Sequence, residues 1–129
     1  MASFKDLSQP GLSVAVCAPR LPCGSATERV EQITGVRLNP VSEESRVDDV
    51  LQKVIAGRAD AGVAYVSDAI GAGSLITAVP FAEAAGVVIT YPIAVLKQSK
   101  NSELAHKFVD MVSGQTGQQI LSTAGFAKP

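Results

Sequence analysis

The chain has 129 residues, which is enough for one hydrophobic core. Hydrophobic residues make up 47% of the sequence and charged residues 18%, a balance that excludes an intrinsically disordered chain. The formal net charge is -1 and no basic run occurs, so the sequence lacks the electrostatic pattern of a nucleic-acid-binding protein. The most apolar region, 78–96, contains Glu83 and two prolines, and we therefore predict no membrane-spanning helix.

The first strong element is the apolar run Leu12–Val16, which is typical of a strand covered on both faces. It leads into residues 17–28, where two prolines restrict the backbone. In this stretch Gly24 and Ser25, followed by Glu28, indicate a capping box at a helix start. A helix start offers N–H groups and the positive end of the helix dipole to an anion. We therefore interpret the stretch as an oxyanion-binding turn, with an ordinary strand-to-helix loop as the alternative.

The predicted helix after this turn covers Ser25–Thr34, with Gly35 as its left-handed C-terminal stop. A second strand is predicted at Val36–Val41. Periodic apolar residues then indicate a second helix, for which Ser42 and Ser45 are both suitable N-caps.

Gly57 ends the second helix, and a third strand is predicted at Asp60–Val66. Ser67 or Asp68 follows this strand as the cap of a short helical turn. The remaining predicted elements are a fourth strand at 75–79, an extended segment at 86–96, a helix that Asn101 or Ser102 caps and Gly114 ends, and a last helix at 116–123.

Strands and helices alternate in this order, which predicts an α/β fold with a mostly parallel sheet flanked by helices. Such sheets bind ligands at the carboxyl ends of their strands. The turn at 17–25, the helix entrance at Ser45 and the strand-end residue Tyr65 are therefore predicted to lie at one edge. A strand tyrosine is also a common core residue, so both roles of Tyr65 stay open at this point.

Catalytic and metal-binding patterns are weak in this sequence. His106 is the one histidine, and it is predicted on the polar side of a late helix without a surrounding cluster of ligands. Cys23 at a helix start favours a thiolate, but no partner base accompanies it. The acidic residues at 43–49 are interpreted as solvated carboxylates near a helix start. We therefore predict that the protein is not an enzyme and that it has no cofactor and no directly coordinated metal.

Cys17 and Cys23 are the only cysteines of the chain. They flank the proline-containing turn and their number is even, so a disulfide is one interpretation. A pair of buried thiols is the other, because sequence spacing does not show whether the two Cα atoms come within bonding distance.

Four segments together resemble the molybdate-binding proteins of bacterial molybdate ABC transporters. They are VAVCAP at 14–19, PCGSATE at 22–28, ADAGVAYVSDA at 59–69 and TYPIAV at 90–95. The resemblance extends from about Phe4 to Lys128 and so covers essentially the whole chain. It is specific, because the proline-small-glycine turn and the tyrosine-x-serine-aspartate strand end rarely occur together elsewhere.

The resemblance implies one lobe of a type II periplasmic binding protein, in which two α/β lobes close over a tetrahedral molybdate or tungstate dianion. In the second lobe, the family binds the anion through a backbone N–H in the proline-small-glycine turn, a backbone N–H at the next helix start and a tyrosine hydroxyl. These positions correspond to Cys23, Val47 and Tyr65. Neutral donors at helix starts can hold a desolvated anion without a buried countercharge.

By the same resemblance, residues 1–90 are the second, ligand-binding lobe. Residues 91–129 are a crossover strand and C-terminal helices, which in the family pack on the first lobe. The first lobe and a signal peptide would precede Met1 and are not in this chain. Without the ligands that the first lobe supplies in the family, we expect this chain to bind the anion weakly. We also expect its exposed C-terminal segment to favour self-association.

The implied role is the substrate-binding component of a molybdate or tungstate importer. It implies a location in the periplasm or cell envelope, and the membrane permease of the transporter as the partner. In an oxidising periplasm the bridge between Cys17 and Cys23 becomes the favoured interpretation. The alternative function is the effector-sensing lobe of a transcriptional regulator with this fold, although the sequence contains no helix-turn-helix segment.

Overall fold

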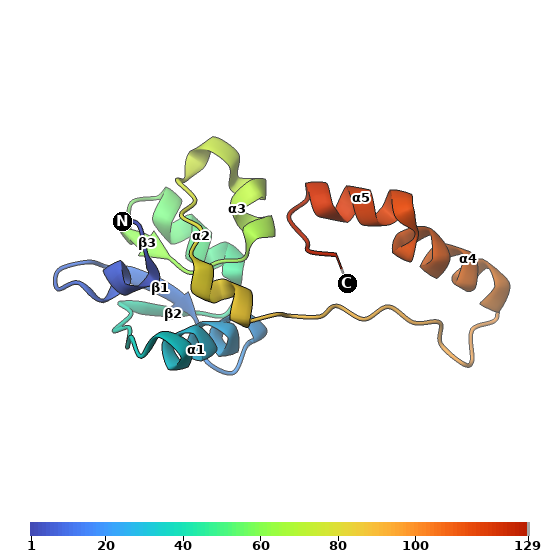
Figure 1. The fold of residues 1–129 in the computed structure, drawn as a ribbon, viewed down its shortest axis with the longest axis horizontal. Helices are drawn as coiled ribbons and strands as arrows, with labels where there is room; N and C mark the ends of the chain where they lie inside the picture. Colours follow the sequence, from blue (N-terminus) through green and yellow to red (C-terminus); the bar gives the residue numbers. More distant parts are fainter. Residues whose placement is uncertain (129) are drawn as a thin grey trace. The chain divides into compact units, whose positions relative to one another are not determined.

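The computed structural model describes residues 1–128. It divides into two compact units, of which the first is Met1–Ile89 and the second begins at Thr90. The first unit contains a parallel sheet with helices around it, and the second contains an extended segment followed by two helices (Figure 1). The predicted α/β fold with a parallel sheet is therefore confirmed.

The described residues form one three-stranded sheet in the order β2-β1-β3. The strands are β1 (Val14–Cys17), β2 (Ser42–Glu44) and β3 (Ala61–Gly62). Both neighbours run parallel to β1, and Ala15 is in register with Ser42 on one side and Gly62 on the other. All four residues of β1 are buried, which explains why its sequence is a continuous apolar run rather than an alternating one.

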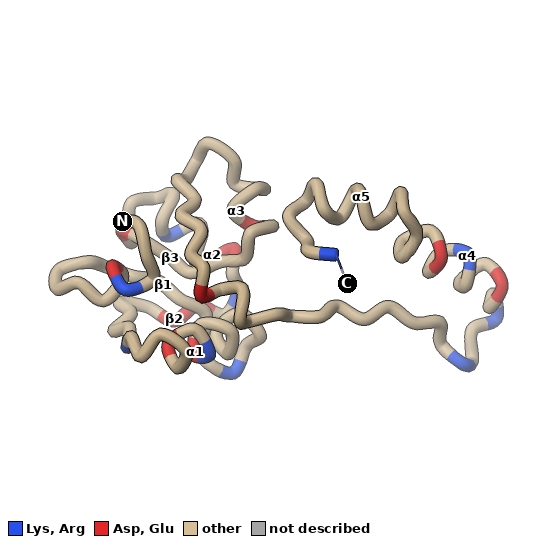
Figure 2. Tube along the Cα trace, in the orientation of Figure 1, with Lys and Arg blue, Asp and Glu red and all other residues tan. Residues whose placement is uncertain are grey.

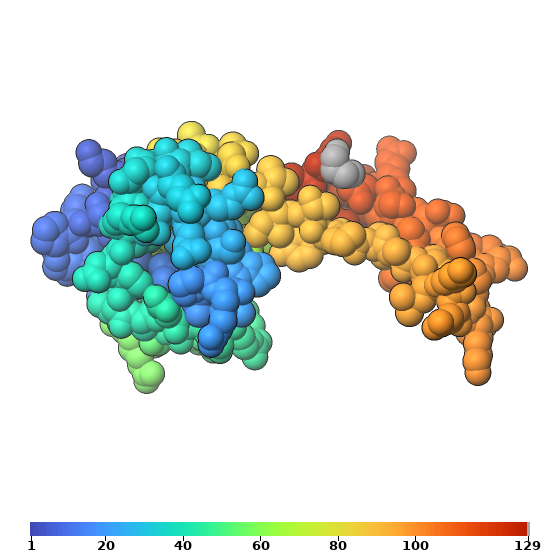
Figure 3. Space-filling model, turned by 90° about the horizontal axis from the view of Figure 1, so that it is seen from below, coloured from blue at the N-terminus to red at the C-terminus, as the bar shows by residue number. Residues whose placement is uncertain are grey.

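Helices cover both faces of the central strand. The helix α1 (Pro22–Thr34) packs on one face through Val30, and α2 (Val47–Ile55) packs on the other through the fully buried Val50. Seen from the α1 side, residues of this helix form much of the surface of the first unit (Figure 3). Alternate residues of β1 therefore belong to two separate apolar clusters, one under each helix.

The two ends of the first unit meet in the cluster under α1. The 3-10 turn η1 (Phe4–Ser8) inserts Phe4, which is 1% exposed. The centroids of the Phe4 and Phe81 rings lie 5.4 Å apart. Phe81 is the residue just before the 3-10 turn η3 (Ala82–Gly86). Residues near positions 4 and 81 thus close the same core, which gives this unit its own hydrophobic interior.

Both predicted helix stops are confirmed. Gly35 ends α1 with φ 69° and Gly57 follows α2 with φ 64°, in the left-handed region that favours glycine. The predicted start of the first helix at Ser25 is wrong, because α1 begins at Pro22 with Leu21 as its N-cap. Proline at the first helical position costs no intrahelical hydrogen bond and has the required φ, so the predicted capping box is not needed and does not start this helix.

The second strand is displaced from its predicted position. The sequence predicts it at Val36–Val41, whereas β2 begins at Ser42. Val36 and Leu38 of the earlier segment instead pack against the cluster under α1, so their spacing reflects packing on this cluster and not hydrogen bonding in the sheet. The segment joins the sheet at its end, where the N–H of Val41 donates to the carbonyl oxygen of Val14 at 2.9 Å.

The third strand is shorter than predicted. The sequence predicts Asp60–Val66, but β3 covers only Ala61–Gly62. The N–H of Val63 still donates to the carbonyl oxygen of Ala15 at 3.3 Å, so one further bond continues the pairing. The chain then enters the helix α3 (Val66–Ala72), and this helix start ends the strand.

The predicted fourth strand at 75–79 is wrong. Within the described chain, this segment leaves the 3-10 turn η2 (Gly73–Leu75) without pairing to the sheet. Leu75 is 66% exposed and Val79 is 37% exposed, so these apolar residues lie at the surface of the described chain.

The second unit contains α4 (Ser102–Ser113) and α5 (Gln115–Thr123). Asn101 occupies the N-cap position of α4, as one of the two predicted caps. Gly117 allows the close turn between the helices, because a Cβ atom there would lie 2.3 Å from the carbonyl oxygen of Val112.

The second unit begins with an extended segment. Tyr91 packs edge-to-face on Phe126, with ring centroids 5.8 Å apart, so this segment contacts the end of the chain beyond α5. The sequence predicts a crossover strand here, but the structure assigns no strand to the described residues after Gly62. None of the helices in residues 1–128 has the length and apolar character needed to cross a bilayer.

Ser13 and Asp60 join the starts of β1 and β3. The N–H of Ser13 donates to Oδ2 of Asp60 at 2.8 Å, and the Ser13 hydroxyl donates to the same oxygen. In return, the N–H of Asp60 donates to the carbonyl oxygen of Ser13 at 2.8 Å. The hydrogen bond from the Ser13 hydroxyl, followed by the one from its N–H, lowers the pKa of the Asp60 carboxyl below the ordinary value of 3.8.

We expect the hydrogen bonds of the Asp60 carboxylate to contribute fully to stability above about pH 4 and to be lost as the pH falls through the lowered pKa. The unfolded carboxyl takes up its proton first on acidification, so acid favours unfolding. Ser13→Ala removes the hydroxyl donor, and it should flatten the fall in the free energy of unfolding that urea denaturation measures between about pH 5 and pH 2.5. Equal slopes for the two proteins would contradict this assignment.

Candidate functional site

Three helix entrances lie at the carboxyl edge of the sheet. β1 ends at Cys17, β2 at Glu44 and β3 at Gly62, and each strand is followed within a few residues by a helix. Because the strands are parallel, these helices all begin at the same edge (Figure 1). The structure thereby brings the predicted turn at 17–25 and the second helix entrance to one side of the molecule.

The three predicted anion-binding residues each stand at one of these entrances. Cys23 is the second residue of α1, Val47 is the first residue of α2, and Tyr65 is the N-cap residue of α3. The N–H groups in the first turn of a helix have no intrahelical acceptor, and they point toward whatever lies before the helix. The positions therefore suit donors to an anion.

The turn before α1 is fixed to the sheet by hydrogen bonds. The N–H of Ala18 donates to the carbonyl oxygen of Glu44 at 2.8 Å, one residue beyond the ladder of β1 and β2. The N–H of Leu21 then donates to the carbonyl oxygen of Ala18 at 3.0 Å, and that of Ser25 to the carbonyl oxygen of Leu21 at 2.8 Å. Cys23 lies between these last two donors, before the helical bonding pattern begins.

Gly24 brings the start of α1 against the end of β1. A Cβ atom at this position would lie 2.0 Å from the carbonyl oxygen of Ala18 and 2.8 Å from that of Cys17. Such distances are far below van der Waals contact, so only glycine fits. The residue pattern predicts Gly24 in a helix cap and does not show this packing role, for which the nearby prolines and cysteine are the available signal.

A disulfide joins Cys17 to Cys23, with the Cα atoms 5.7 Å apart. The bridge confirms one of the two interpretations of the cysteine pair, and the alternative of two buried thiols is wrong. Neither sulfur is therefore free to act as a nucleophile. What Cys23 can offer to a ligand is its backbone N–H.

Cys23 and Val47 pack on the same apolar cluster. This cluster lies under α2, and its buried members are Ala15, Cys17, Val50 and Ala59. The side chains of Cys23 and Val47 are both half-buried against it, so the entrances of α1 and α2 are held next to one interior. The predicted N-caps Ser42 and Ser45 are wrong, because Ser42 belongs to β2 and Arg46 occupies the N-cap position.

Tyr65 is held at the start of α3 by its own backbone. Its N–H donates to Oδ2 of Asp68 at 3.0 Å, and its carbonyl oxygen accepts the N–H groups of Asp68 and Ala69, each at 3.1 Å. The residue is half-buried and its hydroxyl oxygen is shielded from solvent. The sequence predicts Ser67 or Asp68 as the cap, and the structure shows Asp68 instead as the acceptor for the N-cap residue.

Figure 2 marks the positions of the charged residues along the chain. Near the α2 entrance, two ion pairs engage charged side chains. Lys53 Nζ lies 2.6 Å from Oε1 of Glu44, and Arg46 lies 2.6 Å from Oδ2 of Asp48. The Lys53 ammonium, followed by the Ser42 hydroxyl, lowers the pKa of the Glu44 carboxyl. Because both basic groups already have carboxylate partners, the donors at this entrance are mainly neutral N–H groups.

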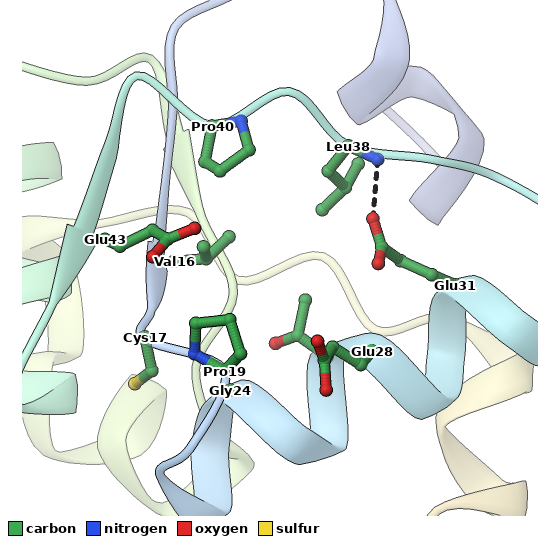
Figure 4. Close-up of a pocket in the computed structure, with 10 residues that line it drawn as sticks. Val16, Cys17, Pro19, Gly24, Glu28, Glu31, Leu38, Pro40 and Glu43 are labelled. Atoms are coloured by element: carbon green, nitrogen blue, oxygen red, sulfur yellow. Dashed lines mark hydrogen bonds between the residues drawn. The ribbon is translucent and has the colours of Figure 1, made fainter.

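A hollow of about 130 Å³ lies along the flank of α1 and reaches the turn before it, where Cys17, Pro19 and Gly24 line it (Figure 4). Three carboxylates line it, those of Glu28, Glu31 and Glu43. Glu31 also accepts the N–H of Leu38 at 2.6 Å. Cys23, Val47 and Tyr65 are not among its lining residues, and its acidic rim would repel an anion, so this hollow is not the predicted site.

Within residues 1–128, no three side chains of the metal-binding types gather into a group that could hold a metal ion. His106 lies exposed on α4, where its Nδ1 is 2.8 Å from the carbonyl oxygen of Ser102. The histidine is thus placed on the surface of a late helix, as the sequence predicts.

We expect Gly24→Ala to destabilise the first unit by about 1–3 kcal/mol, because the new methyl group must push the start of α1 away from the end of β1. Gly71→Ala is the matched control, since nothing lies within 4 Å of a Cβ atom at that helical glycine. The control should leave stability unchanged or raise it by up to about 1 kcal/mol. Urea denaturation measures both, and equal effects would contradict the close packing at Gly24.

Comparison with known proteins places this arrangement in a family. Residues 1–127 match the family model of bacterial extracellular solute-binding proteins. The molybdate-binding proteins ModA of Mycobacterium bovis and Mycobacterium tuberculosis are each 58% identical to the chain over 127 residues. The match covers 98% of this chain and 49% of each relative, so the chain spans about half the length of the relatives it matches.

No solved structure matches the chain. The family model nevertheless spans the whole of the first unit and nearly all of the second. The chain therefore belongs to the family of bacterial extracellular solute-binding proteins.

Proposed function

We propose that this chain provides one wall of the anion site in the substrate-binding component of a molybdate or tungstate ABC importer. The observation that carries the proposal is the meeting of three helix entrances at one sheet edge, with Cys23, Val47 and Tyr65 at their starts. The relatives named above are molybdate-binding proteins, which supports molybdate as the ligand.

The donor set suits a tetrahedral dianion. The N–H groups of Cys23 and Val47 and the hydroxyl of Tyr65 are all neutral, and the helix starts add the positive ends of two dipoles. A dianion that leaves water needs several fixed donors, but it does not need a buried cation. Lys53 and Arg46 already form ion pairs with carboxylates, which agrees with an anion site that contains no buried cation.

The proposed role is binding without chemical conversion. Molybdate would be held as an oxyanion by hydrogen bonds, so that no protein atom coordinates the metal and no cofactor is required. The location that fits is the periplasm or the cell envelope, where oxidising conditions maintain the disulfide between Cys17 and Cys23. The proposed protein partner is the membrane permease of the importer. The alternative of a sensing lobe from a transcriptional regulator gains no support from the relatives.

We expect the 129-residue chain to bind molybdate weakly and Tyr65→Phe to weaken binding further, by about tenfold or more. The substitution removes one hydrogen bond to a charged ligand, worth about 1.5–3 kcal/mol, and changes little volume. Tyr91→Phe is the matched control, because Tyr91 is 65% exposed in the second unit. Isothermal titration calorimetry with molybdate, and with sulfate as the competing anion, measures the effect. Loss of affinity in both variants, or in neither, would contradict the role of Tyr65.

The second unit suits self-association with a second copy of the chain. Leu104, Phe108 and Met111 follow one another at helical spacing along one face of α4, and each is more than half exposed. Ile120 adds another exposed apolar side chain on α5. An exposed stripe of this kind can pair with its own copy across a two-fold axis.

Sedimentation velocity should therefore show a mass that rises with protein concentration. Phe108→Asp places a charge in the stripe and should shift the protein toward the monomer. Gln119→Asp is the matched control, because it changes an exposed polar residue and should leave the association unchanged. A monomer at every concentration would count against self-association.

A further inference from the structure

We propose that the disulfide between Cys17 and Cys23 is a redox-controlled positioning device for the anion site. The inference rests on the proposed function, since it assigns to the bridge the task of holding the Cys23 N–H in its binding position. Oxidation would keep the site preorganised and reduction would loosen it. The oxyanion affinity of the protein would then depend on the redox state of this pair.

The two sulfurs belong to parts of the chain with different anchoring. Cys17 is the last residue of the central strand, is 2% exposed and is in register with Glu44 of β2. Cys23 lies in the first turn of α1 and is only half-buried. The bridge therefore attaches a helix entrance to the most firmly held strand of the sheet.

The backbone hydrogen bonds of the turn attach its beginning, and not Cys23, to the sheet, while the side chain of Cys23 packs on the apolar cluster under α2. The hydrogen bond from Ala18 to Glu44 fixes the beginning of the turn, and the bond from Leu21 to Ala18 closes it. From Cys23 onward the hydrogen bonds stay within the helix, and the Thr27 hydroxyl also donates within it, to the carbonyl oxygen of Cys23 at 3.0 Å. They orient α1 internally but do not tie it to β1.

Gly24 makes the position of the Cys23 N–H sensitive to small movements. The Cα atom of Gly24 packs against the backbone of Ala18 so closely that a methyl group would not fit. If the bridge opens, the contact can widen, because glycine has no side chain to interlock with its neighbours. A displacement of a fraction of an ångström is enough to misdirect a hydrogen bond to a fixed anion.

Cys23 is half-buried whereas Cys17 is 2% exposed, so a dithiol reductant has its better access at Cys23. A thiolate of the reductant would attack Sγ of Cys23 and release Cys17 as a thiolate, which takes up a proton. The second thiol of the reductant would then displace the Cys23 thiolate, which is protonated in turn. Two electrons pass to the pair, and the dithiol becomes a cyclic disulfide.

Binding and reduction are then linked in both directions. If the reduced protein binds the anion more weakly by some factor, the bound anion must disfavour reduction by the same factor. We expect a factor of roughly 5 or more, as is usual for coupled sites. The anion would protect the bridge, whereas sulfate, a smaller oxyanion, would protect it less.

The test compares the oxidised chain, the chain reduced with a phosphine and desalted without oxygen, and the double variant Cys17→Ala/Cys23→Ala. Tungstate is the probe because it resists reduction, and calorimetry measures its affinity. Amide hydrogen exchange of residues 18–25 is the second readout, with residues 47–55 of α2 as the internal control. We expect weaker tungstate binding and faster exchange at 18–25 in both disulfide-free forms, with α2 unchanged.

Each outcome decides a different point. Unchanged affinity together with unchanged exchange at 18–25 would overturn the positioning role. Faster amide hydrogen exchange in α2 as well as in 18–25 would also overturn the positioning role, because the bridge would then support the whole fold. An oxidised chain that binds no tungstate would contradict the proposed function, and the exchange contrast between 18–25 and 47–55 would still decide whether the bridge positions this turn.

Discussion

The parallel pairing of β1 with both of its neighbours is the constraint on which the first unit depends. Since β1 is buried on both faces, α1 and α2 must pack on opposite sides of it, and each crossover must return to the same end of the sheet. The helix entrances therefore collect at the carboxyl edge without any contact between the helices being required. A ligand site at this edge is a consequence of the topology, and the residues at the entrances decide its chemistry.

An anion at this edge would be held by geometry more than by charge. Fixed N–H groups stabilise an anion only if their direction is maintained, because each hydrogen bond weakens steeply with misalignment. Two features maintain direction at α1: the bond from Ala18 to Glu44 and the bridge to Cys17. The ion pair between Lys53 and Glu44 keeps a basic group engaged, which favours a site that selects its ligand by shape.

The sequence predicts the central strand, the alternation of elements and the glycine stops at 35 and 57, because burial on both faces and left-handed backbone leave clear patterns. It misplaces the outer strands, since the apolar residues at 36–41 serve packing against α1 and look the same as a strand. Tyr65 as an N-cap was not predictable, because tyrosine is not a usual capping residue. Residue pattern alone indicates an anion-binding turn, whereas the assignment of Cys23, Val47 and Tyr65 depends on the resemblance.

The helices of the second unit bury less of their apolar surface than α1 and α2 of the first unit do. In the part of the chain that the structure describes, α4 and α5 contain no buried residue, although both are amphipathic. Helices of 12 and 9 residues are marginal in water by themselves, and most helical stability in proteins comes from packing of the apolar face. The contact between α4 and α5 covers only part of their apolar faces, since Leu104, Phe108 and Ile120 stay more than half exposed. Any surface that covers Leu104 and Phe108 would therefore add to the stability of these helices.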